Sequence, residues 1–383
     1  MQKIILILFS LNIFSCVLSP THQTVKTTEA RNLATEDTND LSSFNETLLV
    51  GDSSGNLALL KVGADLKSIK VKSKIKPLPI SVHSYNEKFY LLYSNSKFMI
   101  LDPESGLVEK TLDLPVKDPS DFTFASDGQI YVSTKKSSKI LKVDLNSLTE
   151  VASIDLDKLR LSKGKIELHQ LLLIGENLFV QVARFKSRFE HQQAALAVID
   201  TTTNQLRKTI ELSVNDPQIN KTLSGMNPEF PMIYDSRRKM ILLTLKTGEL
   251  SLNMGMIIRI DSNTLEIYDF KKAISGTQGI IAFQEPFSKL FIIYHTSTPV
   301  TSSHLFVDLV DDAGSLQRVE GALIDNFDGL NALAINSTGT LVAMANTCIT
   351  GFCENGAGIN LIDVSTHKVL PKLKSDFIGF QPS

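Results

Sequence analysis

Seven polar residues in this chain are spaced so that they could meet in one place and do chemistry. Each lies at or near the start of an apolar run, and they follow one another at intervals of 40 to 60 residues. Carboxylate and amide oxygens bind hard cations such as Ca²⁺, and a histidine near carboxylates can transfer protons. A ring of such residues would form a cation site or an acid–base site. The seven are Ser81, Asp121, His169, Glu229, Gln278, Asn331 and Asp376.

The same residues also have a simpler explanation. Polar side chains are expected around any hydrated channel, and His169 lies in an otherwise apolar run, where a hydrogen-bonded core imidazole is the commoner case. The sequence has no phosphate-binding glycine loop, no Gly-x-Ser-x-Gly motif and no His-Glu-x-x-His motif. We therefore predict no cofactor and leave a metal open, and we treat an enzyme as the alternative rather than the expectation.

A repeated phrase marks the elements that would position these residues. A short apolar run ends in aspartate, a polar turn follows, and a second apolar run begins. The carboxylate can accept backbone N–H groups of the turn that follows it, which is a structural role. The phrase recurs at Asp102, Asp144, Asp200, Asp261 and Asp363. Turn glycines for which we expect positive φ are Gly55, Gly106, Gly128 and Gly339.

The spacing of the phrase predicts the fold. From residue 46 onward, short runs rich in Val, Ile, Leu, Phe and Tyr alternate with turn residues, and no run has helical periodicity. The runs group in fours around each aspartate, with Asp311 marking the sixth group, at intervals of 42 to 61 residues. Such a repeat is typical of a β-propeller. We predict an all-β, seven-bladed β-propeller of four-stranded antiparallel blades over residues 46–383, and a monomer.

The first and last groups predict how the ring closes. The first group has only three strands, at residues 47–51, 56–62 and 67–71. Residues 376–380 form a surplus strand that resembles the inner strand expected within residues 279–286. We predict that this C-terminal strand joins blade one, because closure removes the open sheet edges that promote aggregation.

The blade endings resemble those of seven-bladed propellers of the YVTN and YncE-like type, within the quinoprotein-dehydrogenase-like group. The residues that carry the resemblance are 198–204, with Asp200, and 361–366, with Asp363; residues 130–134 are the nearest match to the family's Tyr-Val-Thr-Asn strand. The resemblance covers most of the chain after residue 45. The chain has no Trp, which argues against a true quinoprotein dehydrogenase. Lactonase-type propellers resemble the arrangement of polar residues at the channel mouth.

Long connections predict a recognition surface. Between the second and third strands, the connections are short in blades one to three and long in blades four to seven. In a propeller these connections share one face, where function is usually located. The simpler alternative is neutral loop drift, which surfaces tolerate. The binding residues predicted on this loop face are Arg184, Arg188, His191, His295 and His304.

The N-terminus predicts export. Lys3 precedes an apolar run over residues 4–13, and small or polar residues follow, so residues 1–19 form a signal peptide. Residues 13–16 also resemble a bacterial lipobox, in which Cys16 would be lipidated; ordinary cleavage near residues 15–19 is the alternative. Residues 20–45 are polar and predict a flexible stalk. The expected location is secreted, periplasmic or outer-surface lipoprotein, with membrane contact only through the lipid.

Cysteine and charge complete the sequence prediction. Cys348 and Cys353 lie in one short segment and predict a disulfide in an exported protein, with free thiols as the alternative. The net charge is −2, and Lys and Arg are scattered, so we expect no nucleic-acid partner. The function predicted is a non-enzymatic binding or scaffold module for a protein or small molecule. The alternative is an exported lactonase or hydrolase at the channel mouth.

Overall fold

The computed structural model describes part of the 383-residue chain. The described residues are 3–7, 46–51, 57–62, 69–75, 77–126, 128–161, 164–187, 190–216, 221–226, 232–247, 255–272, 281–284, 289–295, 303–310, 316–318, 324–327, 332–335, 341–346, 358–366, 368–370 and 373–374. Apart from the 3₁₀ helix η2 (Asp157–Leu159), every regular element in these ranges is a β-strand. None of the helices searched in these ranges is long and apolar enough to span a membrane.

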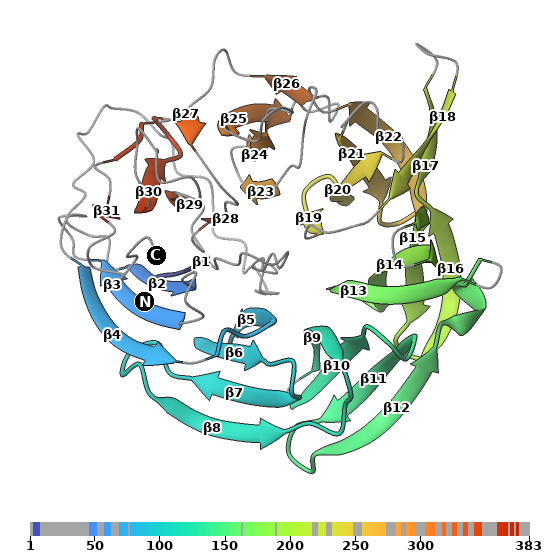
Figure 1. Cartoon of the computed structure of the whole chain (residues 1–383), viewed down its shortest axis with the longest axis horizontal. Coiled ribbons are helices and arrows are strands. Elements are labelled where there is room, and N and C mark those ends of the chain that lie inside the picture. The colour runs from blue at the N-terminus through green and yellow to red at the C-terminus, as the bar shows by residue number, and fades with distance from the viewer. Residues whose placement is uncertain are drawn as a thin grey trace, which may run out of the picture.

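The described strands group into seven sheets, which Figure 1 shows arranged in a ring. The first sheet holds β1 (Lys3–Ile7), β2 (Glu46–Gly51), β3 (Leu57–Val62) and β4 (Ile69–Ile75). The second holds β5 (Ser81–Tyr85), β6 (Lys88–Leu92), β7 (Lys97–Leu101) and β8 (Val108–Asp113). The third holds β9 (Pro119–Ser126), β10 (Gln129–Thr134), β11 (Lys139–Asp144) and β12 (Thr149–Asp155). The fourth holds β13 (Lys165–Ile174), β14 (Asn177–Ser187), β15 (Glu190–Asp200) and β16 (Gln205–Glu211).

The later sheets carry additional strands. The fifth holds β17 (Ser213–Asp216), β18 (Lys221–Met226), β19 (Ile233–Asp235), β20 (Met240–Thr247), β21 (Gly255–Asp261) and β22 (Glu266–Lys272). The sixth holds β23 (Ile281–Gln284), β24 (Lys289–His295), β25 (Ser303–Val310), β26 (Leu316–Arg318) and β27 (Ile324–Phe327). The last holds β28 (Ala332–Ile335), β29 (Leu341–Asn346), β30 (Gly358–Asp363) and β31 (Leu373–Lys374).

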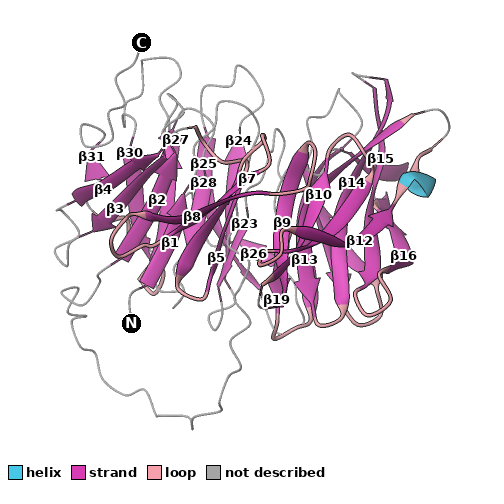
Figure 2. Ribbon diagram, turned by 90° about the horizontal axis from the view of Figure 1, so that it is seen from below, coloured by secondary structure: helices cyan, strands magenta, loops and turns pink. Residues whose placement is uncertain are grey.

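The sheets follow one plan. In the second, third and fourth sheets the first strand lies nearest the centre of the ring and the last lies on the outside, as β5 to β8 show; in the fifth sheet β19 lies nearest the centre, and β17 and β18 lie outside (Figure 1). Inner strands such as β13 run roughly along the ring axis, whereas the outer strands β8 and β12 are strongly tilted (Figure 2). Among the described pairs, every pairing is antiparallel except that of β1 with β2, which is parallel. The all-β fold and the four-stranded antiparallel sheets predicted from the sequence are therefore confirmed.

The closing strand differs from the expectation. The inner position of the first sheet is occupied by β1, which pairs with β2 from Lys3 opposite Glu46 to Ile7 opposite Val50. The sequence analysis assigned this position to residues 376–380, which lie outside the described residues. The structure therefore does not confirm closure by the C-terminal strand, and the observed occupant comes from the other end of the sequence.

Apolar side chains fill the spaces between neighbouring sheets. Phe98, Phe122 and Val132 belong to a cluster between the second and third sheets. Tyr131, Leu168 and Val180 belong to another between the third and fourth. Because each sheet is buried on both faces by its neighbours, its middle strands are apolar on both sides. This explains why the strand sequences read as continuous apolar runs.

The repeated aspartates have the predicted structural role. In each described phrase the carboxylate accepts turn N–H groups at hydrogen-bond distance: Asp144 Oδ1 accepts from Asn146 and Ser147, both at 2.9 Å. Asp200 accepts from Thr202 at 2.8 Å and Thr203 at 3.0 Å. The same bonds form at Asp102, Asp261 and Asp363. The phrase is thus a turn signal that ends each third strand.

The fourth residue after Asp102, Asp144, Asp200 and Asp261 has a left-handed backbone. Gly106 has φ +71°, as predicted, and Gly128 in another turn has φ +79°. At the position matching Gly106, Leu148 has φ +56° and Leu265 has φ +59°. A leucine is strained in this conformation, but Leu265 is only 5% exposed and packs in the core between the fourth and fifth sheets. Side-chain burial therefore offsets the backbone cost.

Replacing Asp144 by asparagine is expected to lower the unfolding temperature by a few degrees at pH 7 and to have no effect in acid. The N–H groups of Ser147 and Asn146 lower the pKa of Asp144. A lowered folded-state pKa adds stability above the unfolded value, and that stability is lost as the pH falls through the folded value. Thermal unfolding from pH 7 down to about pH 2 would measure this. The control, Asp113→Asn at the exposed end of β8, should have no effect; an equal loss at both pH values would contradict the prediction.

Candidate functional site

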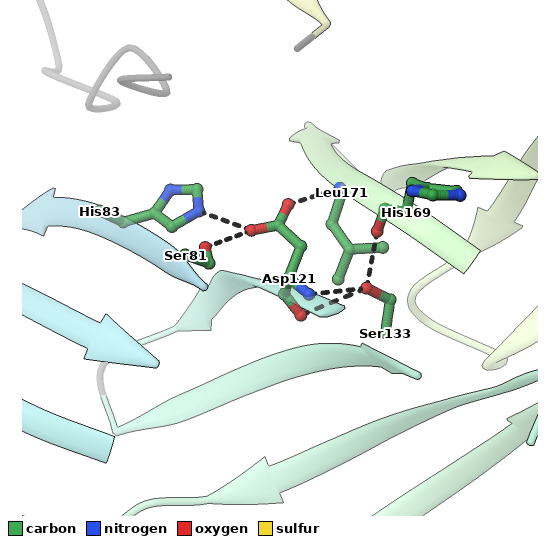
Figure 3. Close-up of polar contacts among 6 residues, drawn as sticks. All are labelled: Ser81, His83, Asp121, Ser133, His169 and Leu171. Atoms are coloured by element: carbon green, nitrogen blue, oxygen red, sulfur yellow. Dashed lines mark hydrogen bonds and ion pairs between the residues drawn. The ribbon is translucent and has the colours of Figure 1, made fainter. Parts of the chain in front are cut away.

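Three inner strands bring polar residues together at the centre of the ring. Strands β5, β9 and β13 come from the second, third and fourth sheets, and β9 lies against both of the others. Figure 3 shows the polar contacts that join them. Three of the residues predicted to line a channel mouth, Ser81, Asp121 and His169, belong to these strands. We refer to Ser81, His83, Asp121, Ser133 and the Leu171 backbone N–H as the inter-blade cluster.

Asp121 is the centre of the inter-blade cluster. Its carboxylate accepts a hydrogen bond from Ser81 Oγ, and its Oδ1 lies 3.1 Å from His83 Nε2. Because a carboxylate only accepts, Nε2 must carry the hydrogen. Oδ2 accepts the backbone N–H of Leu171 at 2.9 Å. One buried carboxylate, on a residue 7% exposed, therefore joins three sheets.

A β-bulge in β13 presents the Leu171 N–H. The pairing of β13 with β14 shifts between Leu168 and Leu171, so that the two residues between them form a bulge. Ser133 Oγ, which is fully buried, donates to the His169 carbonyl at 2.6 Å. Asp121 and Ser133 of one sheet thus bond to both sides of the bulge in the next sheet. Bulges re-aim side chains and backbone groups, and here the bulge turns a backbone donor toward Asp121.

This geometry limits what Asp121 can do chemically. Three donors already occupy the carboxylate, and His83 packs edge-on against the Phe122 ring at 4.5 Å. The His169 ring lies on the far side of β13 from Asp121 (Figure 3), so the two predicted residues do not form an acid–base pair. Within the described ranges, no group of three or more His, Cys, Asp and Glu side chains is placed to bind a metal.

A second polar group lies next to the inter-blade cluster. His169 Nε2 lies 3.9 Å from Glu167 Oε2, and both residues belong to the inner strand β13. Burial lowers the pKa of Lys135, which follows β10, and the Glu167 carboxylate opposes this shift. A lysine with a lowered pKa is unprotonated more often near neutral pH, so more of it is available to act as a nucleophile or general base. This group is the part of the described structure in which proton transfer would be chemically reasonable.

Arg184 corrects the sequence analysis. It was expected in an exposed loop, but β14 continues to Ser187, and Arg184 is only 3% exposed. Its Nε donates to the Leu159 carbonyl at 2.7 Å, and its guanidinium forms two bonds to Glu211, of 2.5 and 3.0 Å. The side chain therefore ties the connection before β13 to the outer strand β16, and it is not part of a recognition surface.

The remaining predicted site residues cannot all be placed. His191 lies in β15, opposite Phe185 of β14. His295 and His304 lie at neighbouring positions where β24 and β25 end and begin, opposite Ser303 and Tyr294 respectively. The residues that fall outside the described ranges are Cys16, Arg188, Glu229, Gln278, Asn331, Cys348, Cys353 and Asp376.

Replacing Arg184 by alanine is expected to lower the free energy of unfolding by about 2–4 kcal/mol, because it removes a buried side chain and leaves the Leu159 carbonyl without its donor. Lysine should recover only part of the loss, since it cannot form the two-bond contact with Glu211. Urea denaturation measures both. The control is Lys186→Ala, an exposed partner of Glu190, with an expected change within about 0.5 kcal/mol. A change of that size for Arg184→Ala would refute the buried role.

The sequence analysis missed His83, Ser133 and Glu211. His83 lies two residues after Ser81 in an inner strand, so both share one face of the sheet. That spacing was a usable signal that two polar side chains point the same way from one inner strand. Ser133 and Glu211 gave no such signal, since their partners lie 36 and 27 residues away in sequence.

Comparisons with known proteins support the fold. No protein-family model and no curated protein matches the sequence. Among solved structures, the chain is similar to hydrazine synthase of Kuenenia stuttgartiensis, with 13% identity and a TM-score of 0.52 over 72% of this chain and 73% of that one. It is similar to a chain of the mitotic checkpoint complex, with 12% identity and a TM-score of 0.51 over 85% and 94%. The Swd1 β-propeller domain of Myceliophteria thermophila has 14% identity, with a TM-score of 0.49 over 76% and 83%. The ring of four-stranded sheets and the first two of these similarities support a β-propeller fold and nothing finer.

Proposed function

We propose that this protein is an exported, seven-bladed β-propeller of the YVTN and YncE-like type that binds a partner and catalyses no reaction. A propeller of this kind is a rigid scaffold, and its connections are free to vary without disturbing the core. One of the similar chains belongs to the mitotic checkpoint complex, so a chain of this fold takes part in a protein assembly. The proposed binding surface is the loop face of blades four to seven.

The lengths of the connections between second and third strands carry this proposal. Residues 93–96 separate β6 from β7, and residues 135–138 separate β10 from β11. The corresponding connections are 248–254 in the fifth sheet, 296–302 in the sixth and 347–357 in the last. In the fourth sheet the strands themselves lengthen to 11 residues each. The added chain is thus concentrated on one end of four consecutive sheets.

The β17–β18 hairpin adds to the same end. Strand β18 pairs with β20 through Gly225 opposite Thr247 and Met226 opposite Lys246. Those β20 residues directly precede the connection to β21, so the hairpin joins the loop face. It extends away from the ring in Figure 1. A projecting two-stranded ribbon beside long connections offers more contact area than the short turns of the second and third sheets.

The inter-blade cluster supports binding over catalysis. Asp121 was one of the channel-mouth residues predicted for a lactonase or hydrolase site, and its carboxylate already accepts from Ser81, His83 and the Leu171 N–H. An enzyme at the centre of the ring remains the alternative, and the Lys135, Glu167 and His169 group favours it. Substituting Glu167 and His169 would abolish lactone or ester hydrolysis under that alternative, whereas partner binding would be unaffected.

We propose that the protein is exported from the cytoplasm. Its location would be secreted, periplasmic or, if lipidated, on the outer surface as a lipoprotein. Mass spectrometry of protein from its native source tests this and the disulfide together. Lipidation predicts a mature chain that begins with a lipid-bearing Cys16, and ordinary cleavage predicts a chain that begins near residue 20. In either case, the Cys348–Cys353 disulfide predicts a gain of two hydrogens on reduction. A chain that still begins at Met1 would contradict export.

Site-specific photo-crosslinking tests the loop face. A photoreactive residue at Ser302 or Glu354 should yield covalent adducts with the partner in the native source. The matched control is Ser147, an exposed residue in the turn between β11 and β12 at the opposite end of its sheet. Adducts from Ser147 and none from the two loop positions would contradict the proposal.

A further inference from the structure

The connections on the loop face of the second and third sheets are hydrogen-bonded to one another. The connection from β8 to β9 lies between the two sheets and bonds to both. The Leu114 N–H donates to the Ser96 carbonyl of the second sheet at 2.9 Å, and the Asp118 carbonyl accepts the Lys135 N–H of the third sheet at 2.9 Å. This part of the loop face is therefore a fixed surface, and little entropy is lost when it binds a partner.

The connection from β12 to β13 continues this fixed surface onto the fourth sheet. The Leu156 N–H donates to the Ser138 carbonyl at 2.9 Å, and Ser138 Oγ donates to Asp157 Oδ1 at 3.0 Å. At its far side the Leu159 carbonyl accepts from Arg184 Nε at 2.7 Å. The connections of three successive sheets thus hold one another in place, and the side chains on them keep fixed relative positions.

Exposed cations gather on this surface. Six of them lie in or next to the connections 114–118, 135–138 and 156–164, and we call this set the basic platform: Lys117, Lys136, Lys139, Lys158, Arg160 and Lys165. The exposed acids in the same places are four: Asp113, Asp118, Asp155 and Asp157. Asp118 pairs with Lys136 at 2.6 Å, and Asp157 pairs with Arg160. The other four cations of the platform, all lysines, form no ion pair with any residue that the structure describes.

The opposite end of the same three sheets is acidic. The carboxylates of Asp102, Asp144 and Asp200 accept turn N–H groups there, and these bonds lower their pKa values and keep them ionised at neutral pH. Further exposed acids at this end are Glu87, Glu104, Glu109, Glu150 and Glu176. The fold therefore sorts charges that are scattered in the sequence onto two faces, and the net charge of −2 conceals this separation.

An exposed leucine lies among the cations of the platform. Leu161 is 39% exposed, and Arg160 and Lys165 flank it in the sequence. The segment rests directly on β14, because a Cβ on Gly164 would lie 2.2 Å from the Phe185 carbonyl oxygen. An apolar side chain held among cations suits the boundary of an anionic bilayer, where leucine enters the acyl region and lysines meet the head groups.

The arginines of this surface are already engaged. The Arg160 guanidinium binds Asp157 and donates to the Gly164 carbonyl at 3.0 Å, and Arg184 binds Glu211. Neither of these two is free to clamp a single phosphate or carboxylate with two parallel bonds. The lysines are separate point charges spread over neighbouring connections. This arrangement suits an extended negative surface better than one small anion.

We propose that the basic platform binds the head groups of an anionic lipid bilayer, with Leu161 entering the boundary of the acyl chains. The bilayer repels the acidic end of the same sheets, so the loop face is turned toward the membrane. The connections of blades four to seven lie on that face too, and a partner bound there would be met at the membrane surface. The inference depends neither on lipidation of Cys16 nor on partner binding by those blades.

Co-sedimentation of the full chain with lipid vesicles tests the platform. The vesicles contain phosphatidylcholine alone or equal parts of phosphatidylcholine and phosphatidylglycerol. Residues 4–13 are apolar and can bind any bilayer, so the measured quantity is the excess binding to the anionic vesicles. This excess should disappear at high salt, because exposed charges are screened. Replacing Lys139, Lys158 and Lys165 together by glutamine should reduce it about tenfold or more.

Matched variants control for net charge and for exposed apolar surface. The combination of Lys110→Gln, Arg207→Gln and Lys239→Gln removes the same charge from exposed positions elsewhere and should change the excess little. Leu161→Ser should weaken binding several-fold, whereas Leu107→Ser, at a residue that is 67% exposed at the opposite end, should not. All of these residues are exposed, so the unfolding temperatures should stay equal.

Two outcomes would overturn the proposal. An equal loss of binding in the two triple variants would show that only the net charge matters. Equal binding to neutral and anionic vesicles would exclude the bilayer; if the platform variant then lost salt-sensitive binding to polyglutamate beads, the partner would be an acidic protein instead. Photo-crosslinking from Ser302 and Glu354 reports separately on partner binding, so a failure of membrane docking is distinguished from a failure of the proposed function.

Discussion

Replacement of Asp121 by alanine is expected to lower the free energy of unfolding by about 3–5 kcal/mol. The change removes the acceptor for Ser81, His83 and the Leu171 N–H, all of which are donors in a buried region. A buried donor that loses its partner costs about 1–3 kcal/mol. The loss acts at two interfaces, because the three donors come from the sheets on either side. Urea denaturation monitored by circular dichroism measures it.

Two Asp→Asn substitutions, one buried and one exposed, show whether the loss of stability depends on the location of the carboxylate. Asp121→Asn keeps one acceptor oxygen and should cost less than alanine. Asp118→Asn makes the same chemical change three residues earlier, where the carboxylate is exposed and pairs with Lys136 at 2.6 Å. Surface pairs contribute little, so this control should change stability by about 0.5 kcal/mol or less. If the two asparagine variants were equally stable, the inter-blade cluster would have no special role.

Replacement of Phe122 by alanine is expected to cost about 3–5 kcal/mol. Phe122 is fully buried between the second and third sheets, with ring centroids 4.5 Å from His83 and 4.9 Å from Phe98. Removing the ring forfeits its burial and leaves a cavity that the rigid sheets cannot close. Leucine should cost less, because it fills part of the space. Chemical denaturation of the three proteins gives the order directly.

A surface control and a double substitution test the Phe122 prediction further. Leu107→Ala removes a residue that is 67% exposed and should change stability little. Because Asp121 bonds His83 and Phe122 packs on it, the two alanine substitutions together should cost less than the sum of their separate effects. Strict additivity would show that His83 does not connect the two.

Local sequence features predicted most of the architecture. The apolar runs fixed the strands, and the Asp144 phrase predicted a turn whose hydrogen bonds are those observed. These features depend on residues only a few positions apart, so periodicity and turn chemistry suffice to find them. The same reasoning placed Asp121 and His169 on inner strands.

The candidate site was harder to predict because its contacts join different sheets. Asp121 meets His83 from 38 residues before it and Leu171 from 50 residues after it. The bulge in β13, which turns the Leu171 N–H toward Asp121, contains no glycine or other turn residue from which the sequence could predict it. Arg184 was misplaced for a related reason: a charged residue was taken as a loop residue, whereas Glu211 on another strand neutralises it inside the fold.

The distribution of these contacts also determines the order in which the molecule can assemble. Strands β5 to β8 pair only with strands adjacent to them in the chain, so this sheet can form as soon as residues 81–113 have been synthesised. The bond between Asp121 and His83 can form only after the third sheet has been synthesised, and the bond to the Leu171 N–H only after the fourth. Both bonds therefore form later than the second sheet, when neighbouring sheets dock. Each new sheet can therefore dock against the preceding one as it is synthesised, whereas the seam where β1 meets β28 and β29 forms after the last sheet has been synthesised.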